Sequence, residues 1–374
     1  MLAGCVLIVV LIVGALLGGR LTRTSAGAHA SRTTSLHAGI AYGDELAYMS
    51  SGQLSQALDD ARAIGAHWVR ADLSWADVQR NSSTSYDWSG FDRVVAGASA
   101  RGLKVLPTLG YTPAWARPAG CDSQSCRPAR VATFAAFARA AVDRYAARGV
   151  HTWEIWNEPN SRGFWQPGPN PDEYTTLLRA SVEAIRALDN GAFIVSGGLA
   201  AVTTRNGDIS PVDFLQRVAA LGGTRLVNAV GYHPYTYPLL PSLVTSFGTP
   251  WDRIDRAPVS LKRVLAEYGT PRLPFWLTEY GAPTGGPGIG STGGQSSSTT
   301  HVTEGRQSQI LVDAVRTAWS DANIQGLFIY QDKDRGSSTA TNENFYGIRR
   351  ADGTKKPAFS ALRTALLSLG SGVN

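Results

Sequence analysis

The 374-residue chain is poor in cysteine, in methionine and in charge. It has 3 cysteines and 2 methionines, and charged residues make up only 17% of it. Because 43% of the residues are hydrophobic, the chain can bury a large core, and wholesale disorder is excluded. It also lacks a dense cluster of Lys and Arg interleaved with aromatic residues. Nucleic-acid binding is therefore not expected, although the net charge is +6.

The longest apolar run lies at the amino terminus. Residues 2–17 carry no charge, Arg20 and Arg23 follow, and Ala28-His29-Ala30 offers a small-residue cleavage site. We interpret residues 1–30 as an export signal or as a membrane anchor formed by residues 2–18, although this run is at the short end for a membrane span. Either interpretation predicts that the rest, residues 31–374, is one extracytoplasmic domain, expected to be a monomer.

Two of the cysteines, Cys121 and Cys126, lie close together in the sequence. In an exported protein such a pair is expected to form a local disulfide bond that closes a loop. Free thiols are the alternative, favoured if the chain is cytosolic. No histidine lies nearby in the sequence, so the pair is a poor zinc site. No metal and no cofactor are expected.

Short apolar runs alternate with longer helical patterns along the rest of the chain. The predicted strands are Ala38–Tyr42, Trp68–Leu73, Lys104–Leu109, Thr152–Asn157, Phe193–Ser196, Ala229–His233, Phe275–Glu279 and Gly326–Gln331. The predicted helices that follow them are Leu54–Ile64, Phe91–Ala100, Val131–Ala147, Glu173–Leu188, Val212–Leu221, Val259–Tyr268, Glu304–Trp319 and Ala358–Leu367. Strand–helix alternation indicates parallel strands, and eight such units predict an α/β fold of the closed (β/α)8 TIM barrel type.

Polar residues gather at the ends of these strands, where barrels of this kind carry their active sites. The fourth strand ends in Trp156-Asn157-Glu158-Pro159, in which the proline stops the strand. A second carboxylate, Glu279, ends the seventh strand. Two glutamates in these positions suit glycoside hydrolysis by double displacement, in which one protonates the leaving oxygen and the other attacks the anomeric carbon.

With these residues the chain resembles the clan of retaining glycoside hydrolases built on this barrel, in which an Asn-Glu pair follows strand four and the nucleophile ends strand seven. It is similar to enzymes of families 5 and 39 and to actinobacterial cellulase-like envelope proteins. The resemblance implies that Glu158 is the acid/base and Glu279 the nucleophile. It also implies that Asn157 binds the sugar hydroxyl next to the anomeric carbon.

The same resemblance implies further substrate contacts. His233 and Tyr235 match a His-x-Tyr pattern after strand six, and Arg70 matches a strand-two arginine beside the nucleophile. The clan usually places a tryptophan at the end of strand eight as a platform for the sugar, and this chain has Tyr330 there. Loop aromatic residues are also candidates for stacking on sugars, with the segment Tyr111-Thr112-Pro113-Ala114-Trp115 as the main platform candidate. These residues are Tyr111, Trp115, Trp165, Tyr237 and Trp251.

Two other features are interpreted without a chemical role. Glu154 alternates with Glu158 along its strand and is expected to face inward, lower in the barrel, as a buried carboxylate paired with a base. Residues 285–300 are rich in Gly, Ser and Thr and follow the strand of Glu279. They are expected to be a poorly ordered loop, either a lid over the site or a surface insertion.

The sequence thus predicts a retaining glycosidase that acts on an extracytoplasmic oligosaccharide or polysaccharide. β-Galactofuranosides, β-xylosides and β-glucans are the substrates considered, and the sequence does not decide among them. The alternative is a catalytically inactive carbohydrate-binding barrel of the cell envelope, against which the Asn, His and Tyr residues around both glutamates argue. An acyl hydrolase is disfavoured because the chain lacks a Gly-x-Ser-x-Gly elbow.

Overall fold

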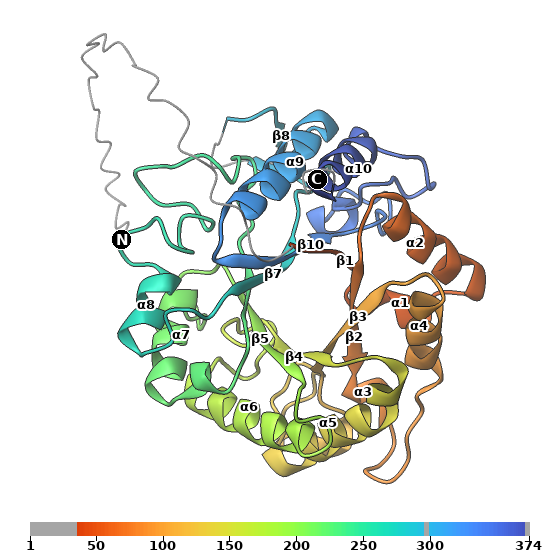
Figure 1. The fold of residues 1–374 in the computed structure, drawn as a ribbon, viewed down its shortest axis with the longest axis vertical. Helices are drawn as coiled ribbons and strands as arrows, with labels where there is room; N and C mark the ends of the chain where they lie inside the picture. Colours follow the sequence, from red (N-terminus) through yellow and green to blue (C-terminus); the bar gives the residue numbers. More distant parts are fainter. Residues whose placement is uncertain (1–35, 295–298, 371–374) are drawn as a thin grey trace, which may run out of the picture. The chain divides into compact units, whose positions relative to one another are not determined.

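The computed structural model describes residues 36–294 and 299–370. Eight parallel strands close into a barrel in the order β1-β10-β7-β6-β5-β4-β3-β2, and helices surround it (Figure 1). The predicted TIM barrel is confirmed. Its strands are β1 His37–Ala41, β2 Trp68–Ser74, β3 Lys104–Gly110, β4 Thr152–Asn157, β5 Phe193–Ala200, β6 Val230–His233, β7 Phe275–Tyr280 and β10 Ile324–Tyr330.

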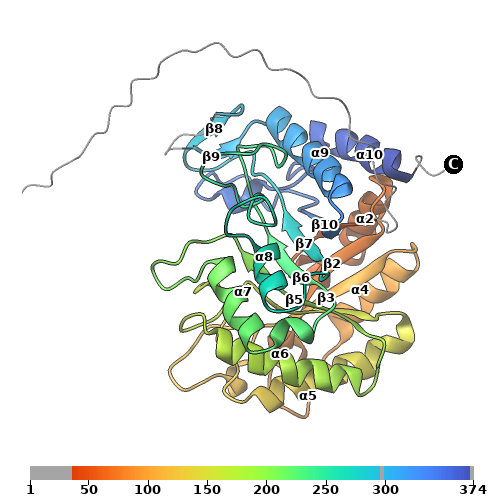
Figure 2. The same ribbon diagram turned by 60° about the vertical axis from the view of Figure 1, so that its left-hand side comes forward.

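Each of the eight predicted helices is present. They are α2 Ser51–Ala63, α4 Ser89–Ser99, α5 Val131–Tyr145, α6 Pro171–Arg186, α7 Pro211–Ala220, α8 Leu261–Glu267, α9 Glu304–Ser320 and α10 Pro357–Gly370. Shorter helical turns precede or follow them: α1 Glu45–Tyr48, α3 Trp75–Val78 and the 3-10 turns Ala114–Ala116, Ala146–Arg148, Gly223–Arg225 and Asn342–Phe345. Consecutive helices lie side by side around the barrel, as α5 and α6 do in both views (Figure 2).

Capping side chains explain where several helices begin. The Ser50 hydroxyl oxygen accepts a hydrogen bond from Gln53 N, and Gln53 Oε1 accepts one from Ser50 N, so α2 starts with a capping box. At the start of α9, the Thr303 hydroxyl oxygen accepts a hydrogen bond from Arg306 N. At the start of α6, Asn170 precedes Pro171. Each helix then runs back to the amino-terminal end of the barrel. Every barrel strand therefore points its carboxyl end to the same mouth.

Aromatic side chains fill the amino-terminal half of the barrel interior. Trp68 and Trp276, near the starts of β2 and β7, meet edge-on with ring centroids 5.5 Å apart. Phe328 of β10 packs on Trp276 at 5.8 Å. These rings exclude water from the lower barrel, so the polar side chains at the strand ends stand on an apolar floor.

The segment after β7 differs from expectation. It contains two short strands, β8 Ile289–Ser291 and β9 Thr299–Val302, which pair in parallel. The prediction of a poorly ordered loop is wrong for these stretches, because main-chain pairing needs no apolar side chains. The Thr300 side chain also links the two stretches, since its hydroxyl oxygen accepts a hydrogen bond from Gly288 N at 3.0 Å.

The predicted disulfide bond is present between Cys121 and Cys126, in the loop between β3 and α5. Around it, Thr112 donates a hydrogen bond to the Cys126 carbonyl oxygen, and Arg117 donates one to the Thr112 carbonyl oxygen. The cross-linked loop therefore holds the segment that follows Tyr111.

The candidate export signal or anchor, residues 1–30, lies outside the described residues. Within the described ranges no helix is both long and apolar enough to span a bilayer.

Candidate active site

A buried ion pair forms the base of the site. Arg70 of β2 and Glu154 of β4 are both 0% exposed, and Arg70 Nε donates to Glu154 Oε2 at 2.5 Å. Thr108 and Thr278 donate to the same carboxylate at 2.9 and 2.8 Å, and so does Gly198 N at 3.0 Å. Because four donors satisfy the Glu154 carboxylate, it is the structural group that its place on the strand predicted.

The other nitrogens of Arg70 point upward to the residues expected to act on the substrate. Nη1 donates to Glu279 Oε1 at 2.7 Å, and Nη2 donates to Asn157 Oδ1 at 2.8 Å. Arg70 itself is fully buried. It was predicted to contact substrate, but the structure places it beneath the cleft, where it fixes Asn157 and Glu279.

Glu279, at the end of β7, has three charged or hydrogen-bonding neighbours. Besides Arg70, Tyr235 donates from its hydroxyl to Oε2 at 3.0 Å, and His233 Nδ1 lies 3.7 Å from Oε2. Burial alone would raise the pKa of Glu279. The charges of His233 and Arg70, with the hydrogen bonds from Tyr235 and Arg70, outweigh it and hold that pKa below its ordinary value. An ionised carboxylate is what a nucleophile requires.

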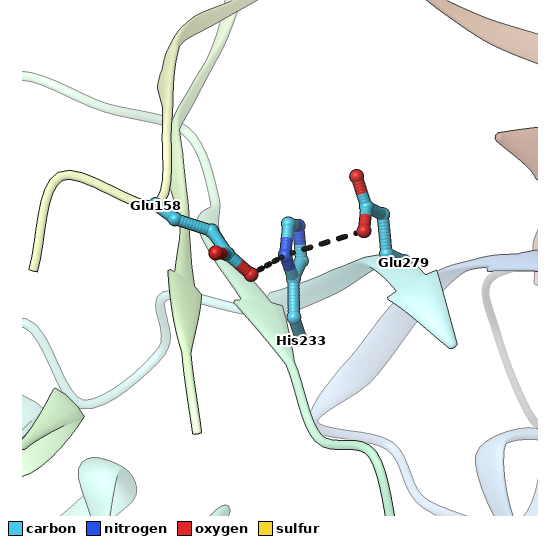
Figure 3. Close-up of side chains that lie close together, drawn as sticks. All are labelled: Glu158, His233 and Glu279. Carbon is cyan, nitrogen blue, oxygen red and sulfur yellow. Dashed lines mark hydrogen bonds and ion pairs between the residues drawn. The ribbon is translucent and has the colours of Figure 1, made fainter. Parts of the chain in front are cut away.

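His233 stands between the two glutamates, as Figure 3 shows. Its Nδ1 lies 2.9 Å from Glu158 Oε1, and its Nε2 lies 3.0 Å from the Thr278 hydroxyl oxygen. Burial by itself would lower the pKa of His233, but the carboxylates of Glu279 and Glu158 more than offset it, so this pKa is raised.

A glycine on β5 makes room for this imidazole. A Cβ atom on Gly198 would lie 2.1 Å from His233 Nε2 and 2.6 Å from Thr278 Oγ1, so a side chain at this position cannot coexist with the observed ring. At the end of β4, Trp156 and the following Glu158 have positive φ angles of 74° and 45°. Such backbone is unfavourable for both residue types and is typical of a functional site.

The separation of the two carboxylates points to one reaction geometry. One oxygen of Glu158, one oxygen of Glu279 and a ring nitrogen of His233 all lie within 4.8 Å of one another (Figure 3). Retaining glycosidases place their two carboxyl groups about 5–5.5 Å apart, whereas inverting enzymes need about 6.5–9.5 Å to fit a water molecule. The three side chains could also ligate a metal ion, but the Arg70 guanidinium at 2.7 Å from Glu279 disfavours another cation there.

A cleft of about 480 Å³ opens above these residues. Predicted residues that line it are Asn157, Glu158, Tyr235, Glu279 and Tyr330, with the loop aromatic residues Tyr111 and Tyr237. Asp72 of β2 also lines it. His233 is 0% exposed and acts from beneath the surface of the cleft. Five of the predicted site residues therefore line one hollow at the mouth of the barrel.

Sequence comparison identifies the family. The sequence model of the cellulase family, glycosyl hydrolase family 5, matches residues 26–221, more than half of the chain. The chain belongs to this family. The matched region contains Glu158, and Glu279 comes later in the sequence. The membership confirms the predicted enzyme class, a glycosidase. None of the curated protein sequences gives a significant match.

Solved structures similar to this family 5 chain share its fold. A family 39 glycoside hydrolase from Bacteroides cellulosilyticus WH2 is 21% identical, with a TM-score of 0.68 over 89% of this chain and 64% of that one. GH5_18 from Streptomyces cattleya, solved with GlcNAc, is 17% identical, with a TM-score of 0.66 over 91% and 82% of the two chains. A monomeric β-xylosidase from Caulobacter crescentus CB15 is 18% identical, with a TM-score of 0.62 over 88% and 67%.

Three aromatic residues predicted as candidate platforms do not face the cleft. Trp115 packs edge-on against Trp75 at 5.5 Å and donates from Nε1 to the Gln79 carbonyl oxygen, so its ring braces the loop after β3. Trp165 and Trp251 are each only 1% exposed. Trp115 thus packs against the core, whereas Tyr111, from the same candidate segment, lines the cleft.

Tyr330 ends β10, the last barrel strand, where the clan usually has a tryptophan. Tyr330 is 8% exposed and lines the cleft, with the Tyr346 ring edge-on at 5.3 Å and the Arg335 guanidinium 5.7 Å from its ring centroid.

Sequence reasoning missed several lining residues because they lie on long loops or short helices without a strand-end signal. They are Asp44, Tyr48, Asp77, Phe164, Arg335, Glu343 and Tyr346.

Proposed function

We propose that this chain is a retaining glycosidase that cleaves O-glycosidic bonds of an extracytoplasmic oligosaccharide or polysaccharide by double displacement. The observation that carries the proposal is the approach of Glu158 and Glu279, whose nearest ligating oxygens lie within 4.8 Å. The family membership supports the same reaction class.

In the first step of this reaction, Glu279 attacks the anomeric carbon while Glu158 donates a proton to the departing oxygen. Glu279 suits attack because Arg70 and Tyr235 hold its carboxylate in place and ionised. Once Glu279 is esterified, its negative charge is gone. Glu158 then takes a proton from water, which releases the sugar with its original anomeric configuration.

Asn157 is placed to bind the hydroxyl next to the anomeric carbon. Its Oδ1 already accepts a hydrogen bond from Arg70, which leaves the amide NH2 free to donate to the sugar or to the nucleophile. Tyr330 and Tyr346 present aromatic surface beside it in the cleft, and such surface suits stacking against a sugar ring.

The substrate and the location are parts of the proposal that need direct tests. A panel of p-nitrophenyl glycosides, including β-xyloside, β-glucoside and β-galactofuranoside, should reveal turnover, and NMR of the first product should show retained configuration. The β-xyloside is the first choice because one similar structure is a β-xylosidase. Inverted product would refute double displacement. No turnover together with glycan binding would favour the non-catalytic alternative.

Export is supported by the bond between Cys121 and Cys126, since such bonds persist in oxidising compartments. Expression of the full chain, followed by fractionation and non-reducing mass spectrometry, should find the bonded protein outside the cytoplasm, and gel filtration should give a monomer. Free Cys121 and Cys126 in cytoplasmic protein would contradict this part of the proposal.

A further inference from the structure

The cleft is more acidic than its proposed chemistry requires. Besides the two catalytic glutamates, its lining includes four carboxylates, whereas Arg335 is the one lining residue with a full positive charge among the described residues. The four are Asp44, Asp72, Asp77 and Glu343. The whole chain, by contrast, carries a net charge of +6. Acidic side chains are therefore concentrated at this cleft.

Asp72 differs from the other three carboxylates because it is buried. It lies on β2 two residues after Arg70, is 6% exposed, and borders both the main cleft and its extension towards α4. Its Oδ2 accepts a hydrogen bond from the Tyr111 hydroxyl at 2.8 Å. Its Oδ1 is buried and has no hydrogen-bond partner among the described residues. A buried carboxylate oxygen without a donor is costly, so a ligand that donates to this carboxylate gains affinity.

We propose that Asp72 is a substrate-binding residue whose carboxylate accepts a hydrogen bond from a sugar hydroxyl or amino group, and that the acidic cleft selects neutral and amino sugars over uronic acids. This inference rests on the proposed function, since it concerns the specificity of the same cleft. The other three carboxylates, which are more exposed, would add to the selection by repelling an anionic sugar.

The electrostatics at Asp72 favour a donor that carries positive charge. Burial raises the pKa of Asp72 to about 7, against the opposing charge of Arg70 and the hydrogen bond from Tyr111, while Glu279 and Asp44 raise it further. An ammonium group beside the Asp72 carboxylate would stabilise its ionised form. A sugar carboxylate would meet an unsatisfied acceptor and like charges.

A matched set of tetrasaccharides tests this selection by binding alone. Isothermal titration calorimetry would use the inactive variant Glu279→Gln with β-1,4-linked tetramers of glucose, glucosamine and glucuronic acid at neutral pH. We expect the glucosamine tetramer to bind at least as tightly as the glucose tetramer, and the glucuronic acid tetramer about 100-fold more weakly, because its carboxylates meet like charges in the cleft.

Two changes at Asp72, made in the same background, separate its charge from its acceptor oxygen. Asp72→Asn keeps an acceptor, so glucosamine binding should weaken about tenfold while glucose binding changes less than about threefold. Asp72→Ala removes the acceptor and should weaken both about tenfold. The control is Asp143→Asn, on the outer face of α5, which removes the same charge at an exposed site. It should change the affinity for none of the tetrasaccharides.

Equal affinity for the three tetramers, preference for the glucuronic acid tetramer, or no binding of any of them would overturn the proposed selectivity. Unchanged binding in both Asp72 variants would overturn the role of Asp72. Wild-type turnover of the aryl glycosides is measured separately. Selective binding without turnover would therefore reject the glycosidase while leaving the specificity of the cleft in place.

Discussion

The Nδ1 atom of His233 lies 2.9 Å from Oε1 of Glu158. On the other side of the ring, the Thr278 hydroxyl donates its one proton to Glu154, so it can only accept from His233 Nε2. With Nε2 protonated, the contact between Nδ1 and Glu158 must hold one further proton. The proton that the leaving group needs is thus already present on this pair before substrate binds.

Removal of the nucleophile is expected to abolish turnover and to open a different reaction. Glu279→Ala should lower kcat by about 10³-fold or more. Added azide or formate should restore part of the activity, because a small anion can occupy the space left by the side chain and attack from the same face. The glycosyl azide should then have the inverted configuration, which NMR can determine. Rescue with retained configuration would contradict the role of Glu279.

Removal of the acid is expected to depend on the leaving group. In Glu158→Ala, formation of the glycosyl-enzyme from dinitrophenyl glycosides should be little affected, because dinitrophenolate departs without protonation. Unactivated phenyl glycosides should lose about 10²–10⁴-fold in kcat/KM. Pre-steady-state kinetics separates the two steps. An equal loss for both leaving groups would exclude Glu158 as the acid.

The hydroxyl of Tyr235 is expected to set part of the pH profile. Burial raises the pKa of Glu279, and the charges of His233 and Arg70 with the Tyr235 hydrogen bond lower it overall. Tyr235→Phe removes one lowering contribution, so the folded pKa rises and Glu279 loses its charge at a higher pH. The acidic limb of kcat/KM should therefore move up by about one pH unit. An unmoved limb would show that this hydroxyl does not tune the nucleophile.

A methyl group on β5 is expected to damage the site from below. Gly198→Ala places Cβ 2.1 Å from His233 Nε2, so the ring must shift away from Glu158. We expect kcat to fall at least about tenfold and the protein to lose about 1–3 kcal/mol of stability. Gly52→Ala is the matched control, because a Cβ there meets nothing within 4 Å. Normal kcat in Gly198→Ala would mean that the position of His233 is unimportant.

The barrel and the two glutamates could be predicted from sequence because both depend on local patterns. Thr152–Asn157 is predicted and observed with the same bounds, since a run of apolar residues ended by Pro159 leaves little freedom. Glu154 follows from alternation on the same strand. Trp115 could not be assigned in this way, because whether a loop aromatic faces sugar or core depends on a distant partner, here Trp75.

Other features of the site depend on contacts between remote parts of the chain. Tyr346 and Glu343 reach the cleft from the loop after β10, and no periodic pattern marks that loop. The strands β8 and β9 lie in a Gly- and Ser-rich segment that burial of side chains does not predict. The unpartnered oxygen of Asp72 likewise becomes visible only when its neighbours are placed.

The guanidinium of Arg70 makes the two halves of the barrel interdependent. It binds Glu154 from β4 and Glu279 from β7 at the same time. Loss of one acceptor from a buried pair of this kind costs about 3–5 kcal/mol. Recombination between relatives therefore cannot exchange the amino-terminal and carboxy-terminal halves freely: a hybrid barrel must inherit a β2 arginine together with a β7 glutamate that reaches it, or it loses stability and its nucleophile in one step.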